Sequence, residues 1–188
     1  MKSPLKGGGR IDLYFEVIMT RTKTEKNSAL VLEFTAYSFI GWLYETILTS
    51  AVWGRFAERG WLHLPICPIY GFCAMALLLI FRKIKNPALI FAVGTIVTTA
   101  AELAASYILE RFTGERLWDY DNWAFNFQGR IALGSSLIFG LLCLLLAKVL
   151  HPAAEYFSNK VSGRAIKITA AITITIILAD TAAVLAGL

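Results

Sequence analysis

Charged residues are scarce in this 188-residue chain, which is 16% charged and 57% apolar, with a mean hydropathy of +0.61. A soluble domain carries about a quarter charged residues and under half apolar residues. A single domain of this size cannot bury so much apolar surface, and a disordered chain needs the opposite composition. The composition therefore excludes both classes and predicts a membrane protein.

Cysteine and histidine are also rare, with three and two copies. Cys67 and Cys73 are six residues apart, which on one helix is about 9 Å of rise and too far for a disulfide. No C-x-x-C occurs, and His63 and His151 are expected on opposite sides of the membrane. We therefore expect no metal site.

Several signatures of enzymes are missing as well. The chain has no G-x-x-x-x-G-K-[ST], no H-E-x-x-H and no G-x-S-x-G, so nothing indicates ATP hydrolysis or the usual hydrolase chemistry. We expect no catalytic residue and no cofactor, and do not expect the chain to be an enzyme. The basic residues form no aromatic-interleaved patch, so no nucleic-acid partner is expected.

What the chain does contain is a set of long apolar stretches. Crossing the hydrocarbon core takes about 20 such residues, and backbone groups in lipid must pair within a helix. The sequence predicts an all-α integral membrane protein with a five-helix transmembrane bundle. The predicted spans are residues 29–53, 64–81, 88–109, 131–150 and 165–188. The second span, which begins with Pro65 and Pro68, is expected to be proline-kinked or partly re-entrant.

The distribution of basic residues predicts the orientation, because Lys and Arg concentrate in cytoplasmic loops. With the N-terminus inside, thirteen of the eighteen basic residues lie on the inner side and five on the outer side. Residues 1–28 then form a polar, basic cytoplasmic tail. Its short apolar patch, Ile11 to Met19, is either frayed or interfacial, or a surface helix that binds a partner. The tail does not resemble a cleavable signal peptide, so we expect the first span to be retained.

Three acids lie inside predicted spans, where an acid is costly and needs a reason. Glu45, Glu102 and Asp180 each stand seven or eight residues before the outer end of their span. At 1.5 Å per residue, all three lie roughly 10–12 Å below the outer boundary. Two interpretations stay open: protonated acids on packing faces that are rich in Ser, Thr and Gly, or a polar cavity that binds a cation, a proton or a polar solute.

The outer loop from Glu110 to Arg130 interleaves aromatic and polar residues. Its aromatic residues suit an interfacial belt, whereas polar residues such as Asp119 and Asn126 suit a loop folded over a cavity as a lid. Arg130 is the natural counter-charge for Glu102 or for the acids of the loop; the alternative is simple interfacial snorkelling.

Four segments resemble a bacterial family of membrane proteins known as ABC-transporter permeases of type IV. They are Phe34 to Ser50, Arg59 to Phe72, Gly94 to Glu110 and Leu117 to Ser136, with the motifs GWLYE, PICPIYG, WDY and N-x-x-GRI. Members of this family tend to have an aromatic residue directly after the acid of the third span; in this chain the acid is Glu102 and the residue after it is Leu103. The resemblance implies a transport permease and adds Tyr70 to the candidate residues. The candidate substrate-binding residues are Glu45, Tyr70, Glu102, Asp119, Asn126 and Arg130.

The leading hypothesis is a multi-pass permease, or permease subunit, of the cell membrane that moves a small polar solute or ion. Five spans rarely enclose a full pathway, so we expect a homodimer or a partner subunit, such as a cytoplasmic ATPase on the basic inner loops. The alternatives are a non-catalytic membrane scaffold or assembly factor, and an embedded enzyme that acts on an envelope lipid.

Overall fold

The computed structural model describes residues 21–116 and 118–188; most of the predicted tail, with Ile11 to Met19, lies outside the described residues. The chain forms two compact units. The first contains the residues up to Cys73 together with Ala153–Leu188, and the second contains Ala74–Pro152. Each unit is described by itself below.

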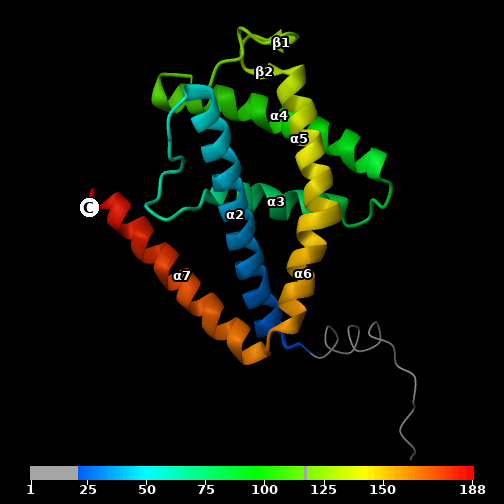
Figure 1. The fold of residues 1–188 in the computed structure, drawn as a ribbon, viewed down its shortest axis with the longest axis vertical. Helices are drawn as coiled ribbons and strands as arrows, with labels where there is room; N and C mark the ends of the chain where they lie inside the picture. The colour runs from blue at the N-terminus through cyan, green and yellow to red at the C-terminus, as the bar shows by residue number, and fades with distance from the viewer. Residues whose placement is uncertain (1–20, 117) are drawn as a thin grey trace, which may run out of the picture. The chain divides into compact units, whose positions relative to one another are not determined.

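The described residues are almost entirely helical (Figure 1). The elements in chain order are α2 (Lys23–Trp53), α3 (Pro68–Phe81), α4 (Pro87–Thr113), β1 (Asn126–Phe127), β2 (Ile131–Ala132), α5 (Leu133–Leu145), the π-helical turn η1 (Leu146–Leu150), α6 (His151–Lys160) and α7 (Gly163–Leu185).

Three helices are long and apolar enough to cross a membrane: Pro87–Thr113, Leu133–Lys160 and Gly163–Leu185. They confirm that the chain is a multi-pass membrane protein, and they coincide with the third, fourth and fifth predicted spans. The helix of the fourth span passes through η1 and continues ten residues beyond the predicted end at Leu150, as α6. Pro152 lacks the N–H of an α-helical bond, and the wider π turn directly precedes it.

The first two predicted spans differ from these three. α2 has 31 residues, about 46 Å at 1.5 Å per residue, but it carries Glu33 and Glu45 and is less apolar. α3 has 14 residues, about 21 Å, so its helical part is shorter than the roughly 30 Å hydrocarbon core. Its helix begins at Pro68, a position where the missing N–H costs nothing.

One element was not expected from an all-α prediction. β1 and β2 pair as antiparallel strands, with Asn126 opposite Ala132 and Phe127 opposite Ile131. Gln128 and Gly129 turn the chain with positive φ angles of 54° and 65°. In Figure 1 this ribbon lies at the N-terminal end of α5.

Small residues bring α4 and α5 together in the second unit. A Cβ atom on Gly94 would lie 2.6 Å from Cys143 Cβ, and one on Gly140 would lie 2.1 Å from Thr95 Oγ1. The two backbones thus approach through glycine on both helices, which is how helices pack closely in lipid.

In the first unit, α2 and α7 contact each other, and their first turns are joined by Glu25. Thr22 and Glu25 form a capping box: Thr22 N donates to Glu25 Oε2 at 3.0 Å, and Glu25 N donates to Thr22 Oγ1 at 3.3 Å. Glu25 Oε1 also lies 3.6 Å from Lys167 Nζ of α7. A Cβ on Gly163 would lie 2.2 Å from the same oxygen, so glycine lets the carboxylate reach the start of α7.

The Glu25 carboxylate should make stability depend on pH. Glu25 lies ahead of the apolar residues 29–53, and the hydrogen bond from the Thr22 amide, followed by the charge of Lys167, lowers its pKa. The ionised carboxylate contributes fully to the free energy of unfolding above its pKa in the unfolded chain, about 4.3. That contribution is lost as the pH falls through the lower pKa of the folded protein. When the pH is lowered from about 6 to about 3, the melting temperature of the purified wild-type protein should fall more than that of the Glu25→Gln variant. If both melting temperatures fall equally with pH, the Glu25 carboxylate does not stabilise the fold.

Candidate functional site

Glu102 lies on α4 in the second unit, where its carboxylate is only half satisfied. Tyr120 OH donates to Glu102 Oε1 at 2.9 Å, and the Ser135 hydroxyl also interacts with the carboxyl group. Glu102 Oε2 is buried and has no hydrogen-bond partner among the described residues. Thr99 Oγ1, three residues earlier on the same helix, is buried without a partner in the same part of the chain. Buried polar atoms of this kind call for a bound water, ion or ligand.

Arg130, directly before β2, is buried and tied to α4. Its guanidinium forms an ion pair with Glu110, donates to Ser106 Oγ at 2.9 Å and lies 4.0 Å from the centre of the Tyr107 ring. Arg130 therefore pairs with an acid at the start of the predicted loop rather than with Glu102.

The loop between α4 and β2 folds back onto α4. Tyr120 reaches Glu102, and Tyr107 OH of α4 donates to Gln128 Oε1 at 2.6 Å. Trp118 Nε1 donates to the backbone carbonyl of Arg130 at 2.9 Å. Because the contacts come from both halves of the loop, its two ends are held against the helix.

Asp119 and Asn126 take part in the hydrogen bonds that shape this loop. Asp119 Oδ1 accepts from Asp121 N at 2.8 Å. Asn126 donates to the carbonyls of Asp121 and Trp123 at 3.2 and 2.9 Å, and it accepts from Gly129 N at 3.0 Å. The side chain of Asn126 is thus engaged as both donor and acceptor within the loop.

Glu45 and Tyr70 are brought together in the first unit. Glu45 Oε1 accepts from Arg59 Nε at 3.0 Å and lies 3.0 Å from Arg59 Nη2, and the Tyr70 hydroxyl interacts with the same carboxyl group. Arg59 N also donates to Thr46 Oγ1 at 3.3 Å. The carboxylate of α2 therefore holds the loop that leads to α3.

Asp180 of α7 binds a later part of the same loop. Its Oδ1 lies 2.9 Å from His63 Nδ1, and its Oδ2 accepts from Leu64 N at 3.2 Å. Glu45 and Asp180 both hold the loop between α2 and α3, whereas Glu102 belongs to the other unit. Among the three acids of equal predicted depth, Glu102 is the one with a buried oxygen that no described residue satisfies.

Sequence reasoning missed Ser106 as a hydrogen-bond partner of Arg130, and Tyr120 as the donor to Glu102. A signal was available: Glu102, Ser106 and Glu110 recur every four residues, so they line one face of α4. Tyr120 had no such signal, because a loop has no fixed period. Within residues 21–116 and 118–188, no group of three His, Cys, Asp or Glu side chains is arranged to hold a metal.

Comparison with known proteins supports the resemblance. Residues 32–185 match the family described as "Putative ABC-transporter type IV". No curated protein and no solved structure matches the chain. The match spans α3, α4, α5, α6 and α7 completely, together with residues 32–53 of α2. The chain therefore belongs to this family of ABC-transporter membrane proteins.

Proposed function

We propose that the chain is a permease, or the membrane subunit of one, that moves a small polar solute or ion past Glu102. The observation that carries this proposal is the buried Glu102 Oε2 without a partner among the described residues; Thr99 Oγ1, three residues earlier on the same helix, is likewise buried without a partner there. An ionisable residue within a membrane helix marks a functional site by default. A carboxylate oxygen accepts hydrogen bonds or binds a cation, so the solute carries a donor or a positive charge.

The proposal includes five membrane crossings with the N-terminus inside and a partner that completes the pathway. The partner is a second copy of the chain or an ATPase subunit that docks on the basic inner segments, Arg82 to Lys85 and Lys148 to Arg164. Membership of an ABC-transporter family supports such an association. The chain itself acts as a non-enzymatic subunit and leaves ATP hydrolysis to its partner.

A membrane scaffold or assembly factor is the second candidate. The contacts of Glu45 with Arg59, and of Asp180 with His63 and Leu64, favour it. Acids that hold a loop in place are needed for folding, whatever the protein does. The two functions differ at Glu102, since only transport requires its free oxygen.

Glu102→Gln tests the proposal. A panel of labelled ions and small polar solutes is first compared in cells with and without the protein, which identifies the solute whose uptake depends on the chain. We expect Glu102→Gln to reduce that uptake about tenfold or more, because one unpaired or lost charge-assisted hydrogen bond is worth about 1.5–3 kcal/mol.

The matched control is Glu115→Gln, which removes an exposed acid of the loop after α4 and should transport as the wild type does. The amount of each variant in the membrane is measured alongside, so that loss of protein is not taken for loss of transport. Normal uptake by Glu102→Gln, or a panel in which no solute depends on the chain, would contradict the proposal and favour the scaffold.

A further inference from the structure

A groove of about 430 Å³ runs between α2 and α7 in the first unit. It is lined from α2 by Lys23, Thr24, Asn27, Ser28 and Val31, and from α7 by Lys167, Ala170, Ala171 and Ile174. All of these residues lie within the first nine residues of α2 or the first twelve residues of α7. The groove therefore starts where both helices start, on one side of the membrane.

The chemistry of the groove changes along its length. Lys23 and Lys167 are exposed at the end nearest the helix starts, whereas Val31 and Ile174 lie at the other end. Lys167 and Ile174 are seven residues apart on α7, about 10 Å of rise, which is about two thirds of the roughly 15 Å that one leaflet's acyl chains occupy. A cationic mouth thus leads to an apolar floor that covers part of one leaflet's depth.

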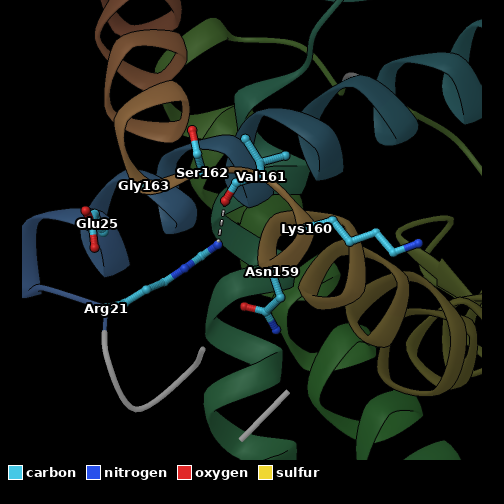
Figure 2. A pocket seen from close by; sticks show the side chains of 7 residues that line it. All are labelled: Arg21, Glu25, Asn159, Lys160, Val161, Ser162 and Gly163. Atoms are coloured by element: carbon cyan, nitrogen blue, oxygen red, sulfur yellow. Dashed lines mark hydrogen bonds between the residues drawn. The ribbon is translucent and has the colours of Figure 1, made fainter. Parts of the chain in front are cut away.

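More positive charge adjoins the mouth. A second pocket of about 360 Å³ includes Arg21, Glu25 and Lys160 in its lining (Figure 2), and its Glu25 forms an ion pair with Lys167 of the groove. Arg21 donates to the carbonyl of Val161 at 3.3 Å, so this cation is fixed at the end of α6. Arg21 therefore lines the same pocket as Glu25, whereas Lys160 extends away from both, with its ammonium 4.2 Å from the centre of the Tyr156 ring.

We propose that this groove binds an anionic phospholipid, with the phosphate group at Lys23 and Lys167 and an acyl chain along Val31, Ala170, Ala171 and Ile174. Basic pockets between transmembrane helices on the cytoplasmic side are suited to anionic headgroups. The predicted orientation places this end of α2 and α7 in the inner leaflet. The lipid would complete the contact between α2 and α7; the inference rests on the proposed orientation of the chain but not on the transport of a solute.

Charge argues against a second copy of the chain as the occupant. A two-fold symmetric contact places the same patch of both copies face to face. Lys23 and Lys167 of one copy would then meet those of the other, and like charges across an interface oppose binding. An anionic headgroup instead matches the mouth, and an acyl chain matches the floor.

The experiment measures lipid that remains bound to the full-length protein. Purified protein is incubated with vesicles of phosphatidylcholine alone, or of equal parts phosphatidylcholine and phosphatidylglycerol, and the bound lipid is counted by mass spectrometry of the intact complex. We expect selective retention of phosphatidylglycerol. Lys23→Gln, which leaves the Glu25–Lys167 pair intact, should lower that retention about fivefold, since one basic residue near an anionic surface is worth about that factor.

Two further variants separate the possible ligands. Lys26→Gln removes the same charge from an exposed position of the same helix turn that does not line the groove, and it should retain the lipid. Ala171→Phe fills the floor but keeps both lysines, so it should also lose the lipid; circular dichroism checks that each variant is folded.

Equal retention by Lys23→Gln and the wild type would overturn the proposal. Full retention by Ala171→Phe, or displacement of the lipid by inorganic phosphate alone, would show that only a free anion or headgroup binds, which overturns it as well.

Discussion

Gly41→Ala should destabilise the protein strongly, although the same exchange usually strengthens a helix by about 0.5–1 kcal/mol. A Cβ atom at Gly41 would lie 2.2 Å from Cγ and 2.3 Å from Cβ of Tyr70. These atoms are at the base of the Tyr70 side chain, so α3 itself must move to make room. We expect a net loss of about 2 kcal/mol, which lowers the melting temperature by roughly 4–8 °C for a chain of this size. Thermal unfolding of the purified protein measures it.

Two comparisons test that the loss comes from this contact. In a Tyr70→Gly background, which removes Cβ of Tyr70 as well as its ring, the added methyl group meets neither atom, so Gly41→Ala should then cost little, which is the non-additivity expected of touching residues. Ala36→Val adds more volume to an exposed position of the same helix and should change the melting temperature only slightly. A Gly41→Ala protein as stable as the wild type would show that α2 and α3 are not packed in this way.

The sequence predicted the helices best where apolar residues alone decide the structure. The spans at 88–109, 131–150 and 165–188 match long helices because nothing but an internally bonded segment is stable in lipid. The span prediction depends on the length of an apolar stretch alone, so it could not show that only Pro68–Phe81 of the second predicted span is helical. There Cys67 N donates to Ser38 O of α2 at 3.0 Å, a contact between distant residues that no local pattern reveals.

The candidate site was predicted in part. Spacing along α4 placed Glu102 on one face with small and hydroxylated residues, and the resemblance added Tyr70, which does meet Glu45. By their predicted depth alone, Glu45, Glu102 and Asp180 are equivalent. Depth says nothing about partners, and the loop between α2 and α3 supplies partners to Glu45 and Asp180. The path of a loop depends on such long-range contacts, so the distinction became visible only in the structure.

Arg130→Met should be the most damaging change in the second unit. Methionine keeps an apolar stem but loses the ion pair with Glu110 and the hydrogen bond to Ser106. Breaking a buried pair costs about 3–5 kcal/mol; because Glu110 is about one-third exposed, water recovers part of that cost. We therefore expect a loss of about 2–3 kcal/mol, measured by denaturant unfolding of the purified protein.

Glu110→Gln in the Arg130→Met background should add little to the loss, since the pair is already broken. Full additivity of the two changes would mean that the residues do not interact.

Arg130→Lys then distinguishes the two roles that the sequence left open. A snorkelling cation needs only a charge at the membrane surface, so lysine would preserve stability. The structure instead has one planar group that serves Glu110 and Ser106 while it lies over the Tyr107 ring. A compact ammonium cannot reproduce that geometry, so Arg130→Lys should recover less than half of the loss. Full recovery of stability by Arg130→Lys would mean that Arg130 acts as a cation at the membrane interface. Partial recovery means that Arg130 packs the loop on α4, the helix that carries Glu102, the carboxylate that we propose the solute meets.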